Sequence, residues 1–443
     1  MTTRRDFIAT AAAATAAVLT PGRLLAALEK QTAPLPDLSQ WSTVRAQFTL
    51  SKEHLQFASF YIVSHPKPVR DAIEDFRRVL DADPFLTVEH RMFEDTPDNV
   101  QYKIRDDMSG YLGAKRDEIA LTGNTTTGLA LVYNGLKLSA GDEILTTTHD
   151  HYSHHESIRF AAGRAGASWR RVSLFERSAT ATTDAMAGKL RAAIRPNTRV
   201  VGLTWVHSST GMRLPIPALA AVVREANRAR GENDQILLVV DGVHGLGCTD
   251  ETVAELGADY FCAGLHKWMF APRGTGMVWA KADRWAKLRP TIPTFADMET
   301  FVGWMKGETP SRPTTAYIMT PGGFHAYEHQ WAISAAFRFH EKMGRARVAK
   351  RIRELNDQCK AGLAAMKNVT LHTPRDPSLS AGICCFEISG VSPDETVKRL
   401  LEKKIVASTS PYIPTYARLA PSLLNTPEEV DAALKAVREI AGA

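Results

Sequence analysis

Residues 236–245 read Ile236-Leu237-Leu238-Val239-Val240-Asp241-Gly242-Val243-His244-Gly245, and this stretch decides the fold. Its apolar run has no polar alternation, which indicates a strand buried on both faces. Strands of this kind belong to parallel sheets covered by helices on both sides. An acid ends the run, and a buried charge is costly unless it is paired.

The flanking sequence alternates short apolar runs with amphipathic stretches. This pattern predicts strands at 119–121, 143–147, 198–206, 236–240, 260–262 and 276–279. It predicts helices at 126–136, 185–193, 216–229 and 251–256. The alternation favours an α/β fold with a mainly parallel sheet.

The alternation of short apolar runs and amphipathic stretches ends near residue 332. A long charged helix is expected to run from there to about residue 366. A short α/β tail follows, with a strand at 383–388 and helices at 394–403 and 427–441. We therefore predict a large domain over 28–331, including the N-terminal segment, and a smaller C-terminal α/β domain over 332–443. A chain of 443 residues is long enough for both.

Open parallel sheets bind ligands at the carboxyl ends of their strands. After the strand at 119–121 comes Thr122-Gly123-Asn124-Thr125-Thr126-Thr127-Gly128, which offers N–H groups and hydroxyls to a phosphate. Thr and Asn are also ordinary helix caps, which is the alternative interpretation.

The loop after 143–147 is rich in histidine, with His149, His151, His154 and His155. Spacing of this kind raises the possibility of a metal site, but no second ligand cluster is evident. We predict no metal, and interpret the loop as the source of an aromatic ring that stacks on a flat cofactor.

Asp241 ends one strand, and Lys267 follows the next predicted strand. Both side chains are therefore expected at one edge of the sheet. A lysine placed there is a candidate amine nucleophile. The alternative is a structural Asp–Lys ion pair.

A lysine, a carboxylate, an aromatic ring and a phosphate-binding loop are together what a pyridoxal phosphate site requires. The sequence resembles the class V aminotransferase group of fold-type I pyridoxal-phosphate enzymes, which includes cysteine desulfurases and isopenicillin N epimerase. The resemblance runs from about residue 56 to 439. Its most specific pieces are residues 238–245 and His266-Lys267-Trp268 with Ala271-Pro272-Arg273-Gly274, the latter most similar to the epimerase branch.

The resemblance implies two catalytic residues, with Lys267 as the Schiff-base lysine and Asp241 as the partner of the pyridine nitrogen. It implies further cofactor contacts from Thr125, Thr126, His151, Ser208, His244, His266 and Thr320. Tyr152 is the alternative to His151 as the stacking ring. Thr320 would reach the cofactor phosphate of a neighbouring subunit, which implies a homodimer. Arg418 would bind the substrate carboxylate, for which a guanidinium fork is well suited.

Several positions depart from the desulfurase pattern. The loop Ser408-Thr409-Ser410-Pro411-Tyr412 has no cysteine where desulfurases carry their nucleophile, which argues against desulfuration. Ala407 replaces a second carboxylate-binding arginine, Ser208 replaces an asparagine, and Gly264 replaces a phosphate-binding serine. These changes fall on the substrate side and on the phosphate cradle.

We expect an enzyme that acts at an amino-acid centre in an epimerase-like or aminotransferase-like reaction. The substrate would be a small-molecule amino acid or a peptide-derived metabolite. A lyase or a side-chain-modifying enzyme is the alternative within the fold. A non-enzymatic exported binding protein is the alternative of another class.

The N-terminus has its own signature. Arg4-Arg5-Asp6-Phe7 precedes an uncharged run over 8–19, which resembles a twin-arginine export signal over 1–27. This run is too short to span a bilayer, so no permanent membrane anchor is expected, and the predicted location is periplasmic or secreted.

Part of the formal charge of +6 lies in this segment, and no nucleic-acid partner is predicted. The five cysteines lack C-x-x-C spacing and are interpreted as core residues.

Overall fold

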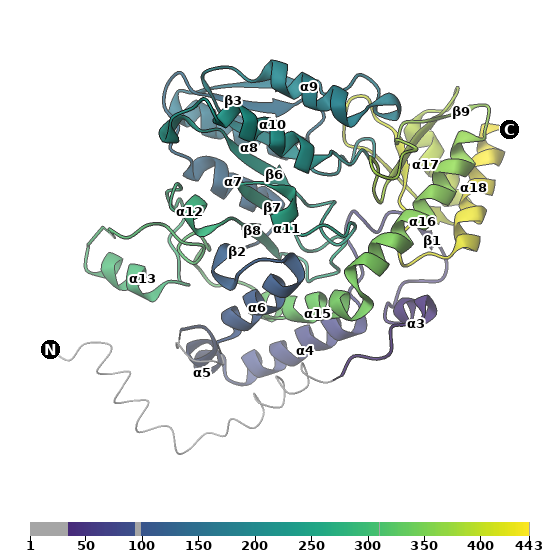
Figure 1. The fold of residues 1–443 in the computed structure, drawn as a ribbon. Coiled ribbons are helices and arrows are strands. Elements are labelled where there is room, and N and C mark those ends of the chain that lie inside the picture. Colours follow the sequence, from purple (N-terminus) through teal and green to yellow (C-terminus); the bar gives the residue numbers. More distant parts are fainter. Residues whose placement is uncertain (1–33, 94–98, 310, 443) are drawn as a thin grey trace.

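The computed structural model describes residues 34–93, 99–309 and 311–442 (Figure 1). The predicted export signal over 1–27 lies outside these residues. In the described ranges, no helix has both the length and the apolar character needed to cross a bilayer.

A seven-stranded sheet forms the centre of the molecule, in the order β2-β8-β7-β6-β5-β3-β4. Its strands are β2 (Ile119–Thr122), β3 (Glu143–Thr147), β4 (Ser168–Val172), β5 (Thr198–Thr204), β6 (Leu237–Asp241), β7 (Tyr260–Gly264) and β8 (Gly276–Trp279). Only β8 runs antiparallel to its neighbours, so the mainly parallel sheet is confirmed. β4 was not predicted, because this edge strand is polar and partly exposed.

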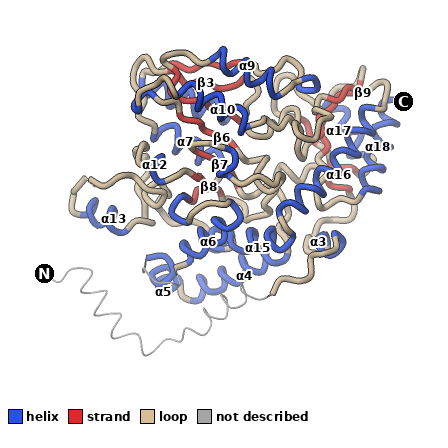
Figure 2. The backbone as a smooth tube through the Cα atoms, in the orientation of Figure 1, coloured by secondary structure: helices blue, strands red, loops and turns tan. Residues whose placement is uncertain are grey.

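Both faces of the sheet are covered, as the apolar run at 236–240 predicts. Leu238 and Val240 face one core cluster and Val239 faces another. The first cluster receives α6 (Val100–Leu112), α9 (Thr183–Ala193), α10 (Ile216–Asn227) and α15 (Ile333–Met343). The second receives α7 (Thr125–Gly135) and α8 (Tyr152–Ala165). Figure 2 shows the strands lying between these helices.

The C-terminal region forms its own α/β unit. Its antiparallel sheet has the order β12-β13-β10-β9. The strands are β9 (Val369–Leu371), β10 (Cys384–Ile388), β12 (Ser408–Thr409) and β13 (Ala417–Leu419). The helices are α16 (Arg345–Ala364), α17 (Pro393–Glu402) and α18 (Pro427–Ala441). The helix predicted from 332 to 366 is in fact divided into α15 and α16, because Gly344 between them has a φ of 84°.

The N-terminal segment also contributes to this unit. β1 (Leu55–Gln56) pairs in parallel with β11 (Ile405–Val406). Phe57 is fully buried in the core of the C-terminal domain. The boundary at 331/332 stays a prediction, but the described N-terminal residues pack against the C-terminal unit as well as the large one.

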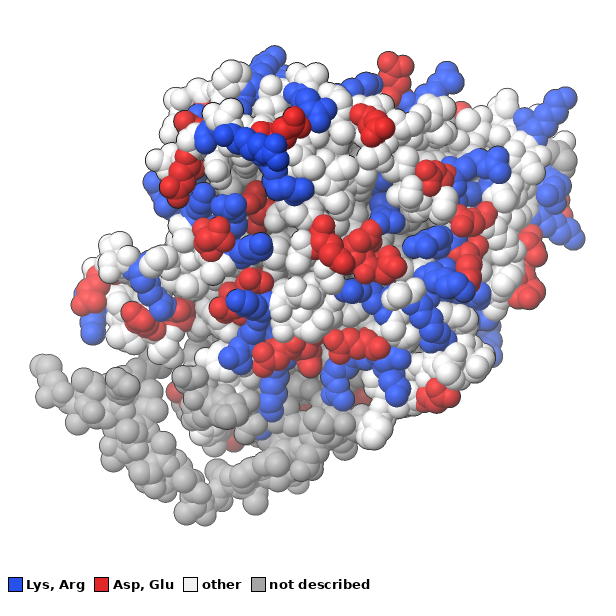
Figure 3. All heavy atoms as spheres, in the orientation of Figure 1, with Lys and Arg blue, Asp and Glu red and all other residues white. Residues whose placement is uncertain are grey.

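The remaining elements surround this framework. They are α3 (Trp41–Arg45), α4 (Lys67–Ala82), α5 (Pro84–Val88), a π-helical turn (Glu89–Phe93), α11 (Val253–Leu256), α12 (Ala282–Trp285), α13 (Met298–Met305), α14 (Tyr327–Trp331) and 3-10 turns at Arg116–Glu118, Ser178–Thr180 and Glu232–Asp234. On the face shown in Figure 3, acidic and basic side chains are interspersed.

Candidate active site

A cavity of about 490 Å³ lies at the carboxyl ends of β2, β3, β5, β6 and β7. The loops that follow these strands form one wall, and the C-terminal domain and the segment around Phe60 form the rest. Of the predicted site residues, those that line the cavity are Thr125, Thr126, His151, Ser208, Asp241, His244, His266, Lys267 and Arg418. Tertiary structure therefore brings together residues nearly 300 positions apart in sequence.

Lys267 and Asp241 form an interacting pair within the cavity wall. Asp241 is 2% exposed, and its Oδ1 accepts a hydrogen bond of 3.1 Å from the Val243 N–H. Burial raises the pKa of Asp241 to about 6, against the opposing effects of that hydrogen bond and of Lys267. Burial lowers the pKa of Lys267 to about 8, and the charge of Asp241 partly offsets this. The lysine is thus closer than usual to its nucleophilic, neutral form at physiological pH.

His244 connects this lysine to Trp268. The Trp268 Nε1–H can only donate, and it lies 3.4 Å from His244 Nδ1. Neutral His244 then carries its proton on Nε2, which lies 3.0 Å from Lys267 Nζ. Burial holds the pKa of His244 well below its ordinary value, and the nearby Lys267 adds to the effect. The imidazole is therefore neutral, and its Nε2–H can donate to Lys267 Nζ once that amine has lost its proton.

The segment before α7 forms an anion cradle. Asn124 caps α7 by accepting from the Thr127 N–H at 2.9 Å, so the first N–H groups of the helix stay free for a ligand. Thr125 Oγ1 accepts from the Gly264 N–H at 2.8 Å. A Cβ at Gly264 would lie 3.0 Å from that oxygen and closer still to the His266 ring, so a serine here would require that ring to shift. Thr125 thus occupies the space that a larger residue at 264 would need.

His266 completes this cradle. Its buried Nδ1 has no hydrogen-bond partner among the described residues. Burial lowers the pKa of His266, and Lys267 lowers it further. An unpaired buried nitrogen beside free helix N–H groups fits the oxygen atoms of a phosphate.

His151 is held at the start of α8, where its Nδ1 lies 2.8 Å from Ser153 Oγ. Its ring lines the cavity, whereas Tyr152 is 64% exposed and does not. This placement favours His151 over Tyr152 as the stacking ring. Burial lowers the pKa of His151 to about 4, so the ring is neutral at physiological pH.

The residue before it, Asp150, anchors the loop. This fully buried carboxylate accepts hydrogen bonds from Thr146 Oγ1, from Thr147 N and Oγ1, and from Thr204 N, at 2.7 to 2.8 Å. It thereby ties the end of β3 to the end of β5 and fixes the position of His151. Sequence reasoning named the loop but assigned Asp150 no role.

Arg418 reaches the cavity from β13. Its guanidinium donates to the Ser208 carbonyl at 2.9 Å, to the Thr409 carbonyl at 2.6 Å and to Ser408 Oγ at 3.2 Å. A guanidinium has more donors than these three bonds use, so N–H groups remain for a carboxylate. Ser208 Oγ lies 2.9 Å from the Tyr412 hydroxyl. Tyr412 was missed as a site residue because it lies in an irregular loop that carries no periodic signal.

Thr320 is the predicted site residue that does not line the cavity. It is buried, and its hydroxyl contacts Arg105 Nη2 at 2.9 Å, the Leu121 N–H at 3.2 Å and the Ala316 carbonyl at 3.0 Å. Within one chain this hydroxyl is occupied by internal contacts. Its role toward a neighbouring subunit stays a prediction.

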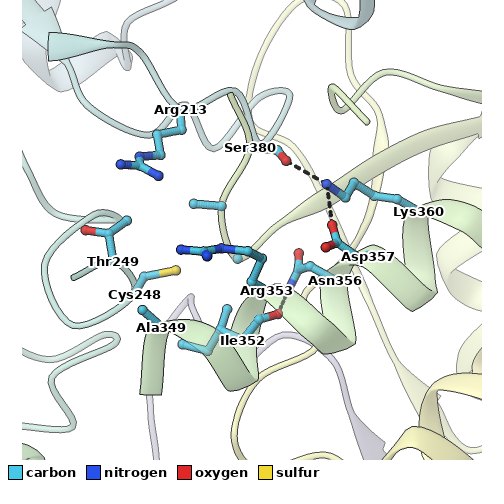
Figure 4. Close-up of a pocket in the computed structure, with 12 residues that line it drawn as sticks. Arg213, Cys248, Thr249, Ala349, Ile352, Arg353, Asn356, Asp357, Lys360 and Ser380 are labelled. Atoms are coloured by element: carbon cyan, nitrogen blue, oxygen red, sulfur yellow. Dashed lines mark hydrogen bonds and ion pairs between the residues drawn. The ribbon is translucent and has the colours of Figure 1, made fainter. Parts of the chain in front are cut away.

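A second cavity, of about 20 Å³, lies between α16 and the loops of the large domain (Figure 4). It has room for about one water molecule. Its cationic side chains are paired: Lys360 with Asp357, Arg353 with Asp250, and Arg213 with Glu251. Among the described residues, no group of three or more His, Cys, Asp or Glu side chains could hold a metal ion. The large cavity is therefore the candidate active site.

The residues of the large cavity fit pyridoxal phosphate. The cradle with the unpaired His266 nitrogen matches its phosphate, Asp241 matches a protonated ring nitrogen, His151 matches the ring face and Lys267 matches the aldehyde. The five cysteines are all buried and free, and none lines this cavity.

Comparison with known proteins agrees with this geometry. The family described as "Aminotransferase class-V" matches residues 64–411. Isopenicillin N epimerase of Streptomyces clavuligerus is 27% identical over 387 residues, covering 85% of this chain and 92% of that protein. A probable cysteine desulfurase of Pyrococcus abyssi is 23% identical over 412 residues, covering 90% and 96%.

The fold also matches solved structures. A mutant of C-DES with glycine covalently linked to its PLP cofactor superimposes with a TM-score of 0.78 at 22% identity, covering 89% of this chain and 98% of that one. This likeness establishes the fold-type I architecture. The family match spans most of the sequence and includes the lysine, the acid and the phosphate cradle. The chain belongs to the aminotransferase class-V family of pyridoxal-phosphate enzymes.

Proposed function

We propose that this protein moves a proton at the Cα atom of an amino-acid group, as an epimerase or an aminotransferase. The observation that carries the proposal is that Lys267, Asp241 and Arg418 line one cavity that no cysteine enters. The first two supply base and electron-sink chemistry, and the third supplies a carboxylate clamp. The relatives named isopenicillin N epimerase, at 27% identity, favour the epimerase alternative.

When bound, pyridoxal phosphate supplies an aldehyde that bonds to amines and a ring that accepts electron density from Cα. Thr125, Thr126 and His266 would hold its phosphate, and His151 would cover its ring. Asp241 would hold a proton at the pyridine nitrogen. Arg418 would fix the substrate carboxylate, and so orient the Cα–H bond toward Lys267.

Lys267 Nζ is the base in this proposal. Its lowered pKa, about 8, makes the neutral amine accessible near physiological pH. His244 donates toward it from Nε2 and so favours that neutral form. The fate of the proton would then separate the two reactions. Delivery of a proton to the opposite face of Cα by a second acid would invert the centre, whereas movement of the proton held on Lys267 to another position would accompany transfer of the amino group.

Desulfuration is the activity named for other relatives. It requires a sulfur acceptor, which the loop before β13 lacks because it carries Ser410 and Tyr412. The chain's own cysteines cannot replace it, since all five are buried away from the cavity.

The test is exchange of the Cα proton in deuterated water, followed by nuclear magnetic resonance with a panel of L- and D-amino acids and short peptides. Exchange with inversion supports an epimerase, and exchange with keto-acid formation supports an aminotransferase. Tight cofactor binding with no exchange for any probe would contradict the proposal and favour a binding protein.

We also propose export by the twin-arginine route, on the basis of Arg4-Arg5-Asp6-Phe7. Changing both arginines to lysine should leave the precursor in the cytoplasm of a host with a twin-arginine translocase. Unchanged periplasmic yield would overturn this proposal.

We further propose a homodimer, since the resemblance assigns Thr320 to a neighbouring subunit's cofactor. Sedimentation of the purified protein measures this directly. A monomer that carries a full complement of cofactor would contradict it.

A further inference from the structure

The charge of the cavity is unbalanced. Among its described lining residues, Asp241 is the only carboxylate, whereas Lys267, Arg273 and Arg418 are cations. In the proposed function Asp241 serves the ring nitrogen, Lys267 the aldehyde and Arg418 the substrate carboxylate. Arg273 is then a cation with no anion assigned to it.

Arg273 has a defined place at the rim. It follows β7, and its backbone carbonyl lies 3.0 Å from His329 Nδ1. Its Nη2 donates to the Val63 carbonyl at 3.2 Å. Val63 directly follows Phe60-Tyr61-Ile62, all of which line the cavity. The arginine therefore connects two of the segments that surround the opening.

The guanidinium is also available. Arg273 is exposed, and the hydrogen bond of its guanidinium goes to a backbone carbonyl and not to a carboxylate. The single bond to Val63 leaves most of its N–H donors free. By contrast, Asp241 at the base of the cavity is only 2% exposed. Arg273 therefore belongs to the solvent-exposed part of the cavity lining, whereas Asp241 belongs to its buried part.

We propose that Arg273 binds a second anionic group of the substrate, so that the substrate is an amino acid with a carboxylate at its distal end. This inference rests on the proposed function, in which Arg418 binds the first carboxylate. An arginine fork is the residue suited to bidentate recognition of such a group.

The cofactor phosphate is the other anion that Arg273 could bind. The residue after Arg273, Gly274, has its carbonyl 3.9 Å from where a Cβ on Gly123 would lie, so the two loops are neighbours. The cradle already offers the first N–H groups of α7 and His266 to the phosphate. The experiment therefore measures both anions separately.

The experiment uses the cofactor-loaded protein and measures the affinity of the dicarboxylates succinate, glutarate, adipate and pimelate by calorimetry. The monocarboxylate of equal chain length is the reference for each. We expect at least one dicarboxylate to bind about tenfold more tightly than its reference, which is about 1.4 kcal/mol. Arg273→Gln should abolish this preference. Arg228→Gln, which removes an exposed arginine at the end of α10 outside the cavity, should retain it.

Three outcomes would overturn the inference: no dicarboxylate preference in the unmodified protein, a preference that survives Arg273→Gln, or a loss of pyridoxal phosphate affinity in Arg273→Gln with the preference intact. The last would assign Arg273 to the phosphate. Failure of the proposed function is a separate result. It would be seen as a protein with no cofactor on Lys267, or as absence of Cα-proton exchange, before any dicarboxylate is added.

Discussion

The two walls of the cavity are built in different ways. On the large-domain wall, Asp241 ends a strand of the central sheet, and Thr125 and Lys267 follow two other strands of that sheet. On the opposite wall, Arg418 comes from an antiparallel sheet, and Tyr412 comes from the loop that precedes its strand. The first wall holds groups suited to the cofactor, and the second holds groups suited to the substrate.

Departures from the desulfurase pattern occur on both walls. Ala407 and the loop at 408–412 belong to the second wall, whereas Gly264 ends a strand of the first wall, where Asp241 and Lys267 are nevertheless retained. Residues at the ends of parallel strands are fixed by the sheet itself, because the register of each strand sets where its last side chain lies. The second wall is a loop and a short strand, where a substitution changes a contact without disturbing the main core. The lysine and the carboxylate of the first wall can thus be retained while the second wall changes more freely.

The largest effect is expected for Lys267→Ala, which removes the amine from the first wall. The cofactor should no longer become covalently attached, while the fold is retained because Lys267 does not belong to any core cluster. Borohydride reduction followed by peptide mass mapping measures the attachment. Lys281→Ala, at an exposed position outside the cavity, is the control. A reduced adduct on another lysine in the mutant would contradict the assignment of Lys267 as the lysine that binds the cofactor.

Asp241→Asn should have the next largest effect. The carboxylate favours the protonated ring, and an opposite charge in contact shifts a pKa by about 1 to 3 units. If the carboxylate stabilises the protonated ring by this amount in the transition state for removal of the Cα proton, the substitution should slow Cα-proton exchange roughly ten- to a thousandfold. The cofactor should remain bound. Single-turnover exchange and thermal unfolding should be measured together. Normal exchange in a well-folded mutant would remove Asp241 from the mechanism.

Arg418→Lys tests the second wall alone. Lysine keeps the charge but loses the fork and the bonds to Ser208, Ser408 and Thr409. Propanoate affinity for the loaded protein should fall about tenfold or more, since hydrogen bonds to charged groups are worth about 1.5 to 3 kcal/mol. Cofactor attachment should be unchanged. A mutant that loses cofactor but keeps propanoate affinity would show that Arg418 serves the cofactor and not the substrate carboxylate.

The smallest effect concerns pH. The pKa of Lys267 is lowered to about 8, so its reactive neutral fraction grows as pH rises toward 8. The rate at which apoprotein attaches pyridoxal phosphate should increase about tenfold per pH unit below 8 and level off above it. Stopped-flow absorbance follows this rate. Asp241→Asn should move the midpoint to lower pH, because the carboxylate is what raises this pKa. A midpoint near that of an ordinary lysine would contradict the assigned environment.

The sequence predicted most of the first wall. The run at 236–240 and the alternation around it identified the covered parallel sheet, and strand ends then located Asp241, Lys267 and the Thr125 cradle. This succeeded because strand period and burial are local properties, and because a parallel sheet aligns its carboxyl ends at one edge. The resemblance added Arg418 and His151.

Tertiary structure alone decided the rest. The contact of Ser208 with Tyr412, the position of Arg273 against Val63, and the pairing of β1 with β11 each join segments far apart in the chain. The break at Gly344 and the internal contacts of Thr320 were also set by packing. Periodicity carries no information about which distant loops meet, because that depends on how whole domains pack. The sequence by itself therefore determined the sheet and the cofactor side of the site, and the packing of the C-terminal and N-terminal segments determined its substrate side.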